Sequence, residues 1–155
     1  VTGYSENELL KFIQDQNVKA WKVMLLWLSF NAIWGILYLF GILDIADLLM
    51  LTVFYFLCDY ICILFFCPFQ KVIMKNKCCT TCRIFNWDHL MMFSPLIFCG
   101  GFFAISLVVI AFIAWLVWEL SILLYPERFS EITNVSLRCS NCTDKLCTQY
   151  CKKIR

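Results

Sequence analysis

The chain has 155 residues, of which 62% are hydrophobic and only 15% are charged, and its formal net charge is +2. Soluble domains contain about 45–50% apolar and about 25% charged residues, and a chain this short cannot bury such an excess in its own core. The composition therefore excludes an ordinary soluble domain and predicts an integral membrane protein whose first partner is the lipid bilayer. The small net charge gives no sign of a basic surface that would bind nucleic acid.

The first predicted element is an amphipathic helix over residues 5–22. Ser5 and Glu8 have the spacing of a capping box, in which each side chain satisfies a backbone amide at the helix start. One apolar face of this helix contains Leu9, Leu10, Phe12 and Ile13. This pattern fits a helix on the membrane surface and equally a helix that packs on the rest of the protein.

Two apolar runs of spanning length follow, at residues 21–43 and 48–68. Trp21 and Lys22 have the side chains that anchor a span at the membrane interface. The short segment 44–47 between the runs contains two aspartates and no basic residue. The sequence therefore predicts two antiparallel transmembrane helices joined by a short acidic turn.

The second half of the membrane region is ambiguous. A basic, cysteine-rich loop at residues 70–89 precedes the apolar segment 90–125. That segment is too long for one crossing of about 20 residues and short for two. It forms either one long tilted helix or two short ones, because Pro95 and the pair Gly100 and Gly101 can break its early part.

Lysine and arginine predict the orientation. They precede the first span, occur in the 70–89 loop and return in the tail, which places the N-terminus and that loop in the cytoplasm. A cytoplasmic tail requires an even number of crossings in 90–125. Two Asn-x-Ser/Thr sequons, at 134–136 and 141–143, favour the opposite side for the tail, so its side stays open.

Together these elements predict an all-α integral membrane protein with three or four transmembrane or re-entrant helices. An amphipathic N-terminal helix precedes them and a short Cys-rich tail follows. The boundary divides a membrane helical domain at residues 1–126 from a polar tail at residues 127–155.

Eleven cysteines are the second anomaly of the sequence. Cys79 and Cys82 form one C-x₂-C pair, and Cys139 and Cys142 form another. Two such pairs are the ligand set of a structural zinc site, because four thiolates complete a tetrahedron around the metal. Possible extra ligands are Cys78, Cys147 and Cys151. Disulfides, an iron–sulfur cluster and unliganded or lipidated thiols remain alternatives to zinc.

Asp59 and Asn31 are polar residues inside the predicted spans. An ionisable group in a span is costly, so we expect Asp59 to face another helix or a cavity and not lipid. Its role is then either a helix contact, with Asn31 or Tyr38 as a partner, or part of a transport pathway.

The function that best fits this pattern is a small multi-pass membrane subunit or scaffold with a Cys₄ zinc site, acting in assembly or partner docking. Its expected partners are other membrane-protein subunits or a second copy of itself. The alternatives are an electron-transfer subunit with an iron–sulfur cluster or redox dithiol, and a transport component that uses Asp59. The sequence contains no nucleophile motif, zinc-protease motif or phosphate loop, which argues against an enzyme.

Overall fold

The computed structural model describes residues 5–65, 67–76, 82–138 and 141, and these residues form helices, turns and loops without a β-strand. The elements in chain order are α1 (Glu6–Leu39), α2 (Ile45–Leu64), η1 (Phe69–Met74), η2 (Phe85–Trp87), α3 (Asp88–Phe93), α4 (Leu96–Cys99), α5 (Phe102–Leu124), η3 (Pro126–Arg128) and η4 (Val135–Leu137).

Helix α1 is continuous over 34 residues. The predicted amphipathic helix at 5–22 is therefore not a separate element, because it forms the first turns of the same helix as the first span. Ser5 caps this helix by accepting a hydrogen bond from the Glu8 amide at 3.2 Å. At about 1.5 Å per residue, α1 is about 51 Å long, well beyond the thickness of about 30 Å of a bilayer's hydrocarbon core.

The acidic turn between α1 and α2 is a helix cap. The Asp44 side chain accepts from the Asp47 amide at 2.9 Å, and the Asp47 side chain accepts from the Asp44 amide at 3.0 Å. This reciprocal capping box satisfies two amides that the first turn of α2 would otherwise leave unpaired. Both aspartates thus have a local structural role at the start of α2.

Residues 90–125 do not form one long helix. Helix α3 ends at Phe93, and Pro95, which has no amide hydrogen to donate, stands between α3 and α4. The chain turns again at Gly100 and Gly101, whose φ angles are +66° and +84°. Only glycine adopts such angles without steric cost, so this glycine pair sets the point where α5 begins.

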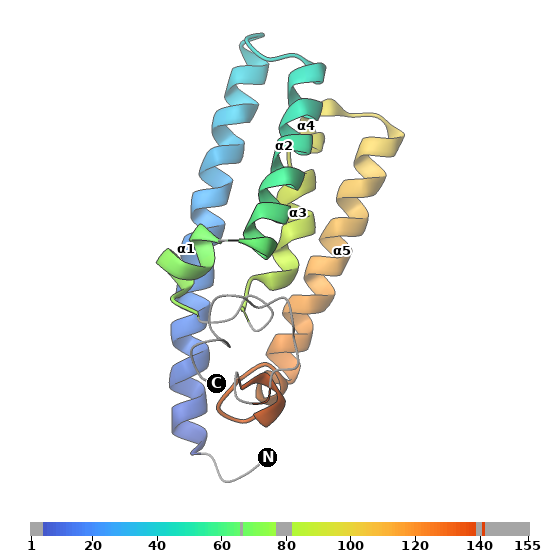
Figure 1. The fold of residues 1–155 in the computed structure, drawn as a ribbon. Coiled ribbons are helices and arrows are strands. Elements are labelled where there is room, and N and C mark those ends of the chain that lie inside the picture. Colours follow the sequence, from blue (N-terminus) through green and yellow to red (C-terminus); the bar gives the residue numbers. More distant parts are fainter. Residues whose placement is uncertain (1–4, 66, 77–81, 139–140, 142–155) are drawn as a thin grey trace.

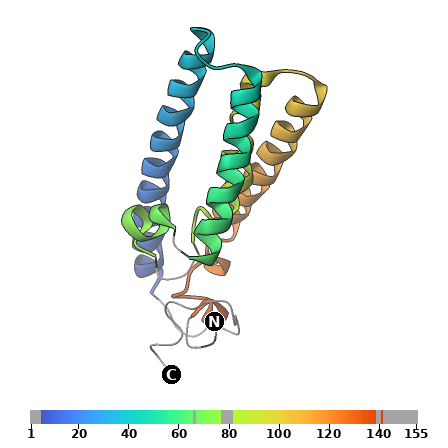
Figure 2. The ribbon, with the colours of Figure 1, turned by 45° about the horizontal axis from the view of Figure 1, so that its top comes forward.

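The helices form an elongated bundle (Figure 1). Helices α1 and α2 are antiparallel, α3 and α4 run beside α2, and α5 returns along the other side of α3 and α4. The segment that contains η2 and the segment that contains η3 therefore lie at the same end of the bundle as the start of α1. The acidic turn and the glycine turn lie at the other end (Figures 1 and 2).

Helix α1 contacts its neighbours through large aromatic side chains. The Trp34 indole donates to the Tyr55 hydroxyl of α2 at 2.8 Å, and the rings of Trp27 and Tyr55 lie 4.8 Å apart. The Trp27 indole also donates to Ser94 Oγ, between α3 and α4, at 3.2 Å. These contacts join α1 to α2 and to the break in the 88–99 segment.

Gly35 allows a second close contact between α1 and the glycine-turn end. A Cβ atom at this position would lie 2.7 Å from Cζ of Phe98 in α4. The absence of a side chain here therefore makes room for the Phe98 ring against the α1 backbone.

Three helices are long and apolar enough to cross a membrane: α1, α2 and α5. Their most apolar windows have mean hydropathies of 1.5, 1.9 and 2.5, yet only 11%, 6% and 11% of those windows are buried within the chain. Apolar surface of this extent is unfavourable in water and favourable in lipid or against a partner.

Candidate functional site: a polar clamp and an acidic cavity

One end of the bundle contains a clamp of polar side chains, defined here as Asn17, Arg83, Trp87, Trp118 and Glu119. Arg83 makes a two-pronged ion pair with Glu119, with N–O distances of 2.6 and 2.5 Å. The Trp87 indole donates to the same carboxylate at 2.7 Å. Because the Arg83 and Glu119 side chains are only 11% and 18% exposed, this ion pair is largely screened from water.

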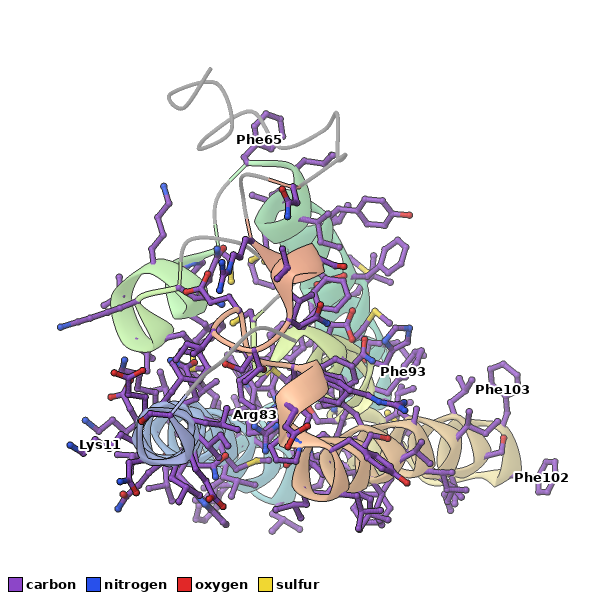
Figure 3. All side chains as sticks on the ribbon, turned by 90° about the horizontal axis from the view of Figure 1, so that it is seen from below. Lys11, Phe65, Arg83, Phe93, Phe102 and Phe103 are labelled. Atoms are coloured by element: carbon purple, nitrogen blue, oxygen red, sulfur yellow. The ribbon has the colours of Figure 1, made fainter. Side chains whose placement is uncertain are left out.

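The rest of the clamp fixes the backbone and the guanidinium of Arg83. The Trp118 indole donates to the Arg83 carbonyl at 3.1 Å, and Arg83 Nε donates to Asn17 Oδ1 of α1 at 3.3 Å. Figure 3 shows Arg83 inside the molecule, between α1 and α5, whereas Lys11 points outward from α1. The clamp therefore joins the cysteine-rich loop to both α1 and α5.

Cys82 lies directly beside the clamp and is buried, with a relative exposure of 4%. It packs with Val23 and Met74 in a small apolar cluster. Cys82 also lines a cavity of about 60 Å³ whose wall includes Leu137 of the tail. The folded start of the tail thus reaches the place where the cysteine-rich loop is anchored.

The structure covers the predicted metal ligands only in part. Cys82 is described, whereas Cys78, Cys79, Cys139, Cys142, Cys147 and Cys151 lie outside the described residues. Within the described ranges, no three His, Cys, Asp or Glu side chains are grouped so as to hold a metal ion. The predicted Cys₄ site therefore stays a prediction.

Asp59 lies on α2 and lines a second cavity, of about 290 Å³. Trp27 of α1 and Asp88 of α3 are also in its wall, so the carboxylate lies where three helices meet. Asp59 has neither a hydrogen bond nor an ion pair with any residue that the structure describes. Asp88 is paired with His89 at 2.6 Å, and the His89 side chain is 62% exposed.

Asn31 does not line the cavity that contains Asp59. Its Nδ2 atom donates to the Trp27 carbonyl at 3.0 Å, within α1. Its Oδ1 atom is buried and accepts no hydrogen bond from the described part of the chain. The structure therefore does not bring together the two polar residues that the sequence singled out in the spans.

Cysteine side chains also line the Asp59 cavity: Cys58, Cys62, Cys67 and Cys82. A hydrogen bond from the Cys62 thiol, assisted by the amides of Gln70 and Phe69, lowers the pKa of Cys67 to about 6 despite the opposing effect of burial. Cys67 lies just after the end of α2. Because its pKa is lowered, a larger fraction of this thiol is in the reactive thiolate form than in an ordinary cysteine.

Sequence reasoning missed the clamp. Glu119 is the one charged residue of the 90–125 segment, and Arg83 is one of several basic residues in the preceding loop. An isolated carboxylate in an apolar helix requires a partner, which is the signal that points to Arg83.

Comparison with models of known protein families, with curated proteins and with solved structures gave no match for this chain. The class of protein is therefore defined by the fold and the site alone: an all-helical chain with three helices of membrane-spanning length, a buried ion-pair clamp at one end and an acidic cavity.

Proposed function

We propose that this chain is a small multi-pass membrane subunit whose cytoplasmic end carries a structural zinc site and serves the assembly or docking of a membrane complex. The zinc ligands are Cys79, Cys82, Cys139 and Cys142. The observation that carries the proposal is the cavity shared by Cys82 and Leu137.

The exposed apolar surface of α1, α2 and α5 supports insertion into a membrane. Few of the apolar side chains in these helices are buried within the chain and many are exposed, and a bilayer or neighbouring membrane helices supply the apolar surroundings that they require. In a subunit of a membrane complex, part of this apolar surface contacts lipid and part contacts the helices of other subunits.

The Arg83–Glu119 ion pair supports a topology in which both cysteine pairs share one side. Arg83 follows the first cysteine pair, and Glu119 lies near the end of α5. Because the two side chains are in contact, the chain between them starts and ends at the same end of the bundle. The basic residues of the 70–89 loop and of the tail then favour the cytoplasmic side together.

The position of Leu137 supports a shared metal site. Cys139 follows Leu137 by two residues, and two residues of extended chain span at most about 7 Å. Cys82 and Leu137 line the same cavity, so the sequence positions of both C-x₂-C pairs adjoin one small volume. Four thiolates there would close a tetrahedral zinc site and would stabilise a tail with little core of its own.

Elemental analysis of the purified full chain tests the proposal. We expect about one zinc per chain, lost in both Cys82→Ser and Cys142→Ser. The matched control is Cys99→Ser, a substitution in α4, toward the other end of the bundle, which should leave the zinc content unchanged. Full zinc retention in either ligand variant, or disulfides within the tail of the native protein, would refute a shared site.

An iron–sulfur cluster uses the same four thiolates and remains the second candidate. The same preparation separates the two, because an iron–sulfur cluster absorbs visible light whereas zinc thiolate is colourless. If iron and sulfide are found in place of zinc, the proposed function changes from a scaffold to an electron carrier.

A further inference from the structure

The Asp59 cavity is mostly apolar and rich in aromatic rings. Five aromatic side chains contribute to its wall, from α1, α2, η1 and η2: Trp27, Phe54, Tyr55, Phe69 and Phe85. Its volume of about 290 Å³ is close to the lower limit of typical small-molecule sites. Shape and lining therefore suit a compact organic molecule better than a bare ion.

The charges in the wall are exclusively negative among the residues that line this cavity. Asp59 and Asp88 contribute carboxylates, and no lysine or arginine is among the described residues that line the cavity. The Asp88 carboxylate already has His89 beside it, whereas Asp59 has no hydrogen-bonded or ion-paired partner in the part of the chain that the structure describes. A half-buried carboxylate in apolar surroundings is stabilised by a cation that enters with its own apolar shell.

Aromatic faces select the same kind of ligand. The negative face of an aromatic ring attracts a cation, and the attraction grows when water is excluded. A carboxylate in a cavity lined by aromatic rings therefore favours a diffuse positive charge surrounded by carbon. A metal ion fits less well, because no group of three His, Cys, Asp or Glu ligands exists within the described residues.

We propose that this cavity binds a lipophilic organic cation, with the Asp59 carboxylate as its counter-charge and the surrounding aromatic rings as its contact surface. The cavity shares Cys82 with the proposed zinc site. Its occupancy does not require zinc, because neither Asp59 nor the aromatic rings are among the proposed zinc ligands. Its position near the C-terminal end of α2 makes it accessible from the end of the bundle that contains the clamp.

The test uses a pair of ions of the same shape and opposite charge, tetraphenylphosphonium and tetraphenylborate, with the purified full chain in detergent. Equilibrium dialysis against empty micelles corrects for partition into detergent. We expect saturable binding of the phosphonium and none of the borate. Equal binding of both ions, or no saturable phosphonium binding by the folded protein, would overturn the proposal without any mutation.

Variants then locate the site. We expect Asp59→Asn to weaken phosphonium binding about tenfold or more, because a charge pair in apolar surroundings is lost, and Asp59→Glu to restore most of it. The matched control is Asp47→Asn in the cap at the opposite end of α2, which should leave binding unchanged. Unchanged binding in Asp59→Asn would show that the cation binds elsewhere. Measuring zinc in the same samples keeps the two proposals apart.

Discussion

Glu119 accepts three hydrogen bonds, two from Arg83 and one from the Trp87 indole. Removing one partner of a buried ion pair is costly because the other charge stays behind without compensation. The guanidinium of Arg83 would keep only Asn17 as a side-chain partner in the clamp. The carboxylate of Glu119 is therefore the central group of the clamp.

We expect Glu119→Ala to lower the free energy of unfolding by about 2–3 kcal/mol, because it leaves the Arg83 guanidinium and the Trp87 indole without the carboxylate that accepts their hydrogen bonds. Reversible unfolding in mixed micelles measures the change. The control is Asp15→Asn, which removes an exposed ion pair with Lys19 on α1 and should cost less than about 0.5 kcal/mol. Similar losses in the two variants would show that the clamp is no stronger than a surface pair.

Cys67 provides a prediction about reactivity. Because its pKa is lowered to about 6, the thiolate is the main form at neutral pH and is protonated as the pH falls through 6. We expect alkylation of Cys67 by iodoacetamide to stay fast at pH 7 and to slow below pH 6, as measured by peptide mass spectrometry.

The variant Cys62→Ala removes the thiol that donates to Cys67, so the alkylation profile should shift to higher pH. The conservative variant Cys62→Ser keeps a donor and should retain most of the original profile. If the profile of Cys67 is unchanged in Cys62→Ala, the backbone amides alone would account for its acidity.

The helices differ in how well the sequence predicted them. Long apolar runs predicted the spanning part of α1 and the whole of α2, because burial in lipid requires continuous apolar sequence. The end of α1 and both ends of α2 lie within a few residues of the prediction, whereas α1 begins much earlier, at Glu6. The continuity of α1 was missed, since a polar first half and an apolar second half look like two elements. The break at Pro95 and the turn at Gly100 and Gly101 were recognisable from residue type.

The clamp and the cavities could not be predicted in the same way. The clamp joins Arg83 and Glu119 across 36 positions of sequence, and each charge had several conceivable partners. The prediction that Asp59 faces protein named Asn31 or Tyr38 as its partner, and neither residue lines its cavity. Helix α3, which contributes Asp88 to this cavity, was not predicted, because it crosses the boundary between the 70–89 loop and the ambiguous segment. Such pairings depend on how helices pack, which periodicity does not encode.

The contact between α1 and α4 depends on the absence of a side chain at Gly35. We expect Gly35→Ala to destabilise the bundle by about 1–3 kcal/mol, because the new methyl group overlaps the Phe98 ring. Thermal unfolding of the double variant Gly35→Ala with Phe98→Leu tests the cause, since a smaller side chain should recover part of the loss. Destabilisation that is independent of residue 98 would contradict this explanation.

The molecule as a whole has two distinct ends. The acidic turn and the glycine turn occupy one end, and the clamp, the start of α1 and the folded part of the tail occupy the other (Figure 1). If the chain is inserted as proposed, one end faces each side of the membrane.

Single-cysteine labelling in sealed vesicles measures this topology. In a background without accessible native thiols, we expect Asp47→Cys and Phe102→Cys, both exposed, to react with an impermeant maleimide from the same side. Glu131→Cys in the tail should react only from the opposite side. Labelling of Phe102→Cys and Glu131→Cys from one side would exclude a membrane-crossing α5.

The length of α1 has a mechanical consequence. The helix contains no proline, and its one glycine, Gly35, lies near its C-terminal end, so it has no hinge over its first turns. About 20 Å of it exceeds the hydrocarbon thickness. The first turns of this stiff helix are held at the clamp through Asn17, and Trp27 farther along the same helix lines the Asp59 cavity. We therefore expect a partner that moves the clamp end of α1 to move the wall of the cavity as well, so that docking at one end of the chain changes the shape of the site within it.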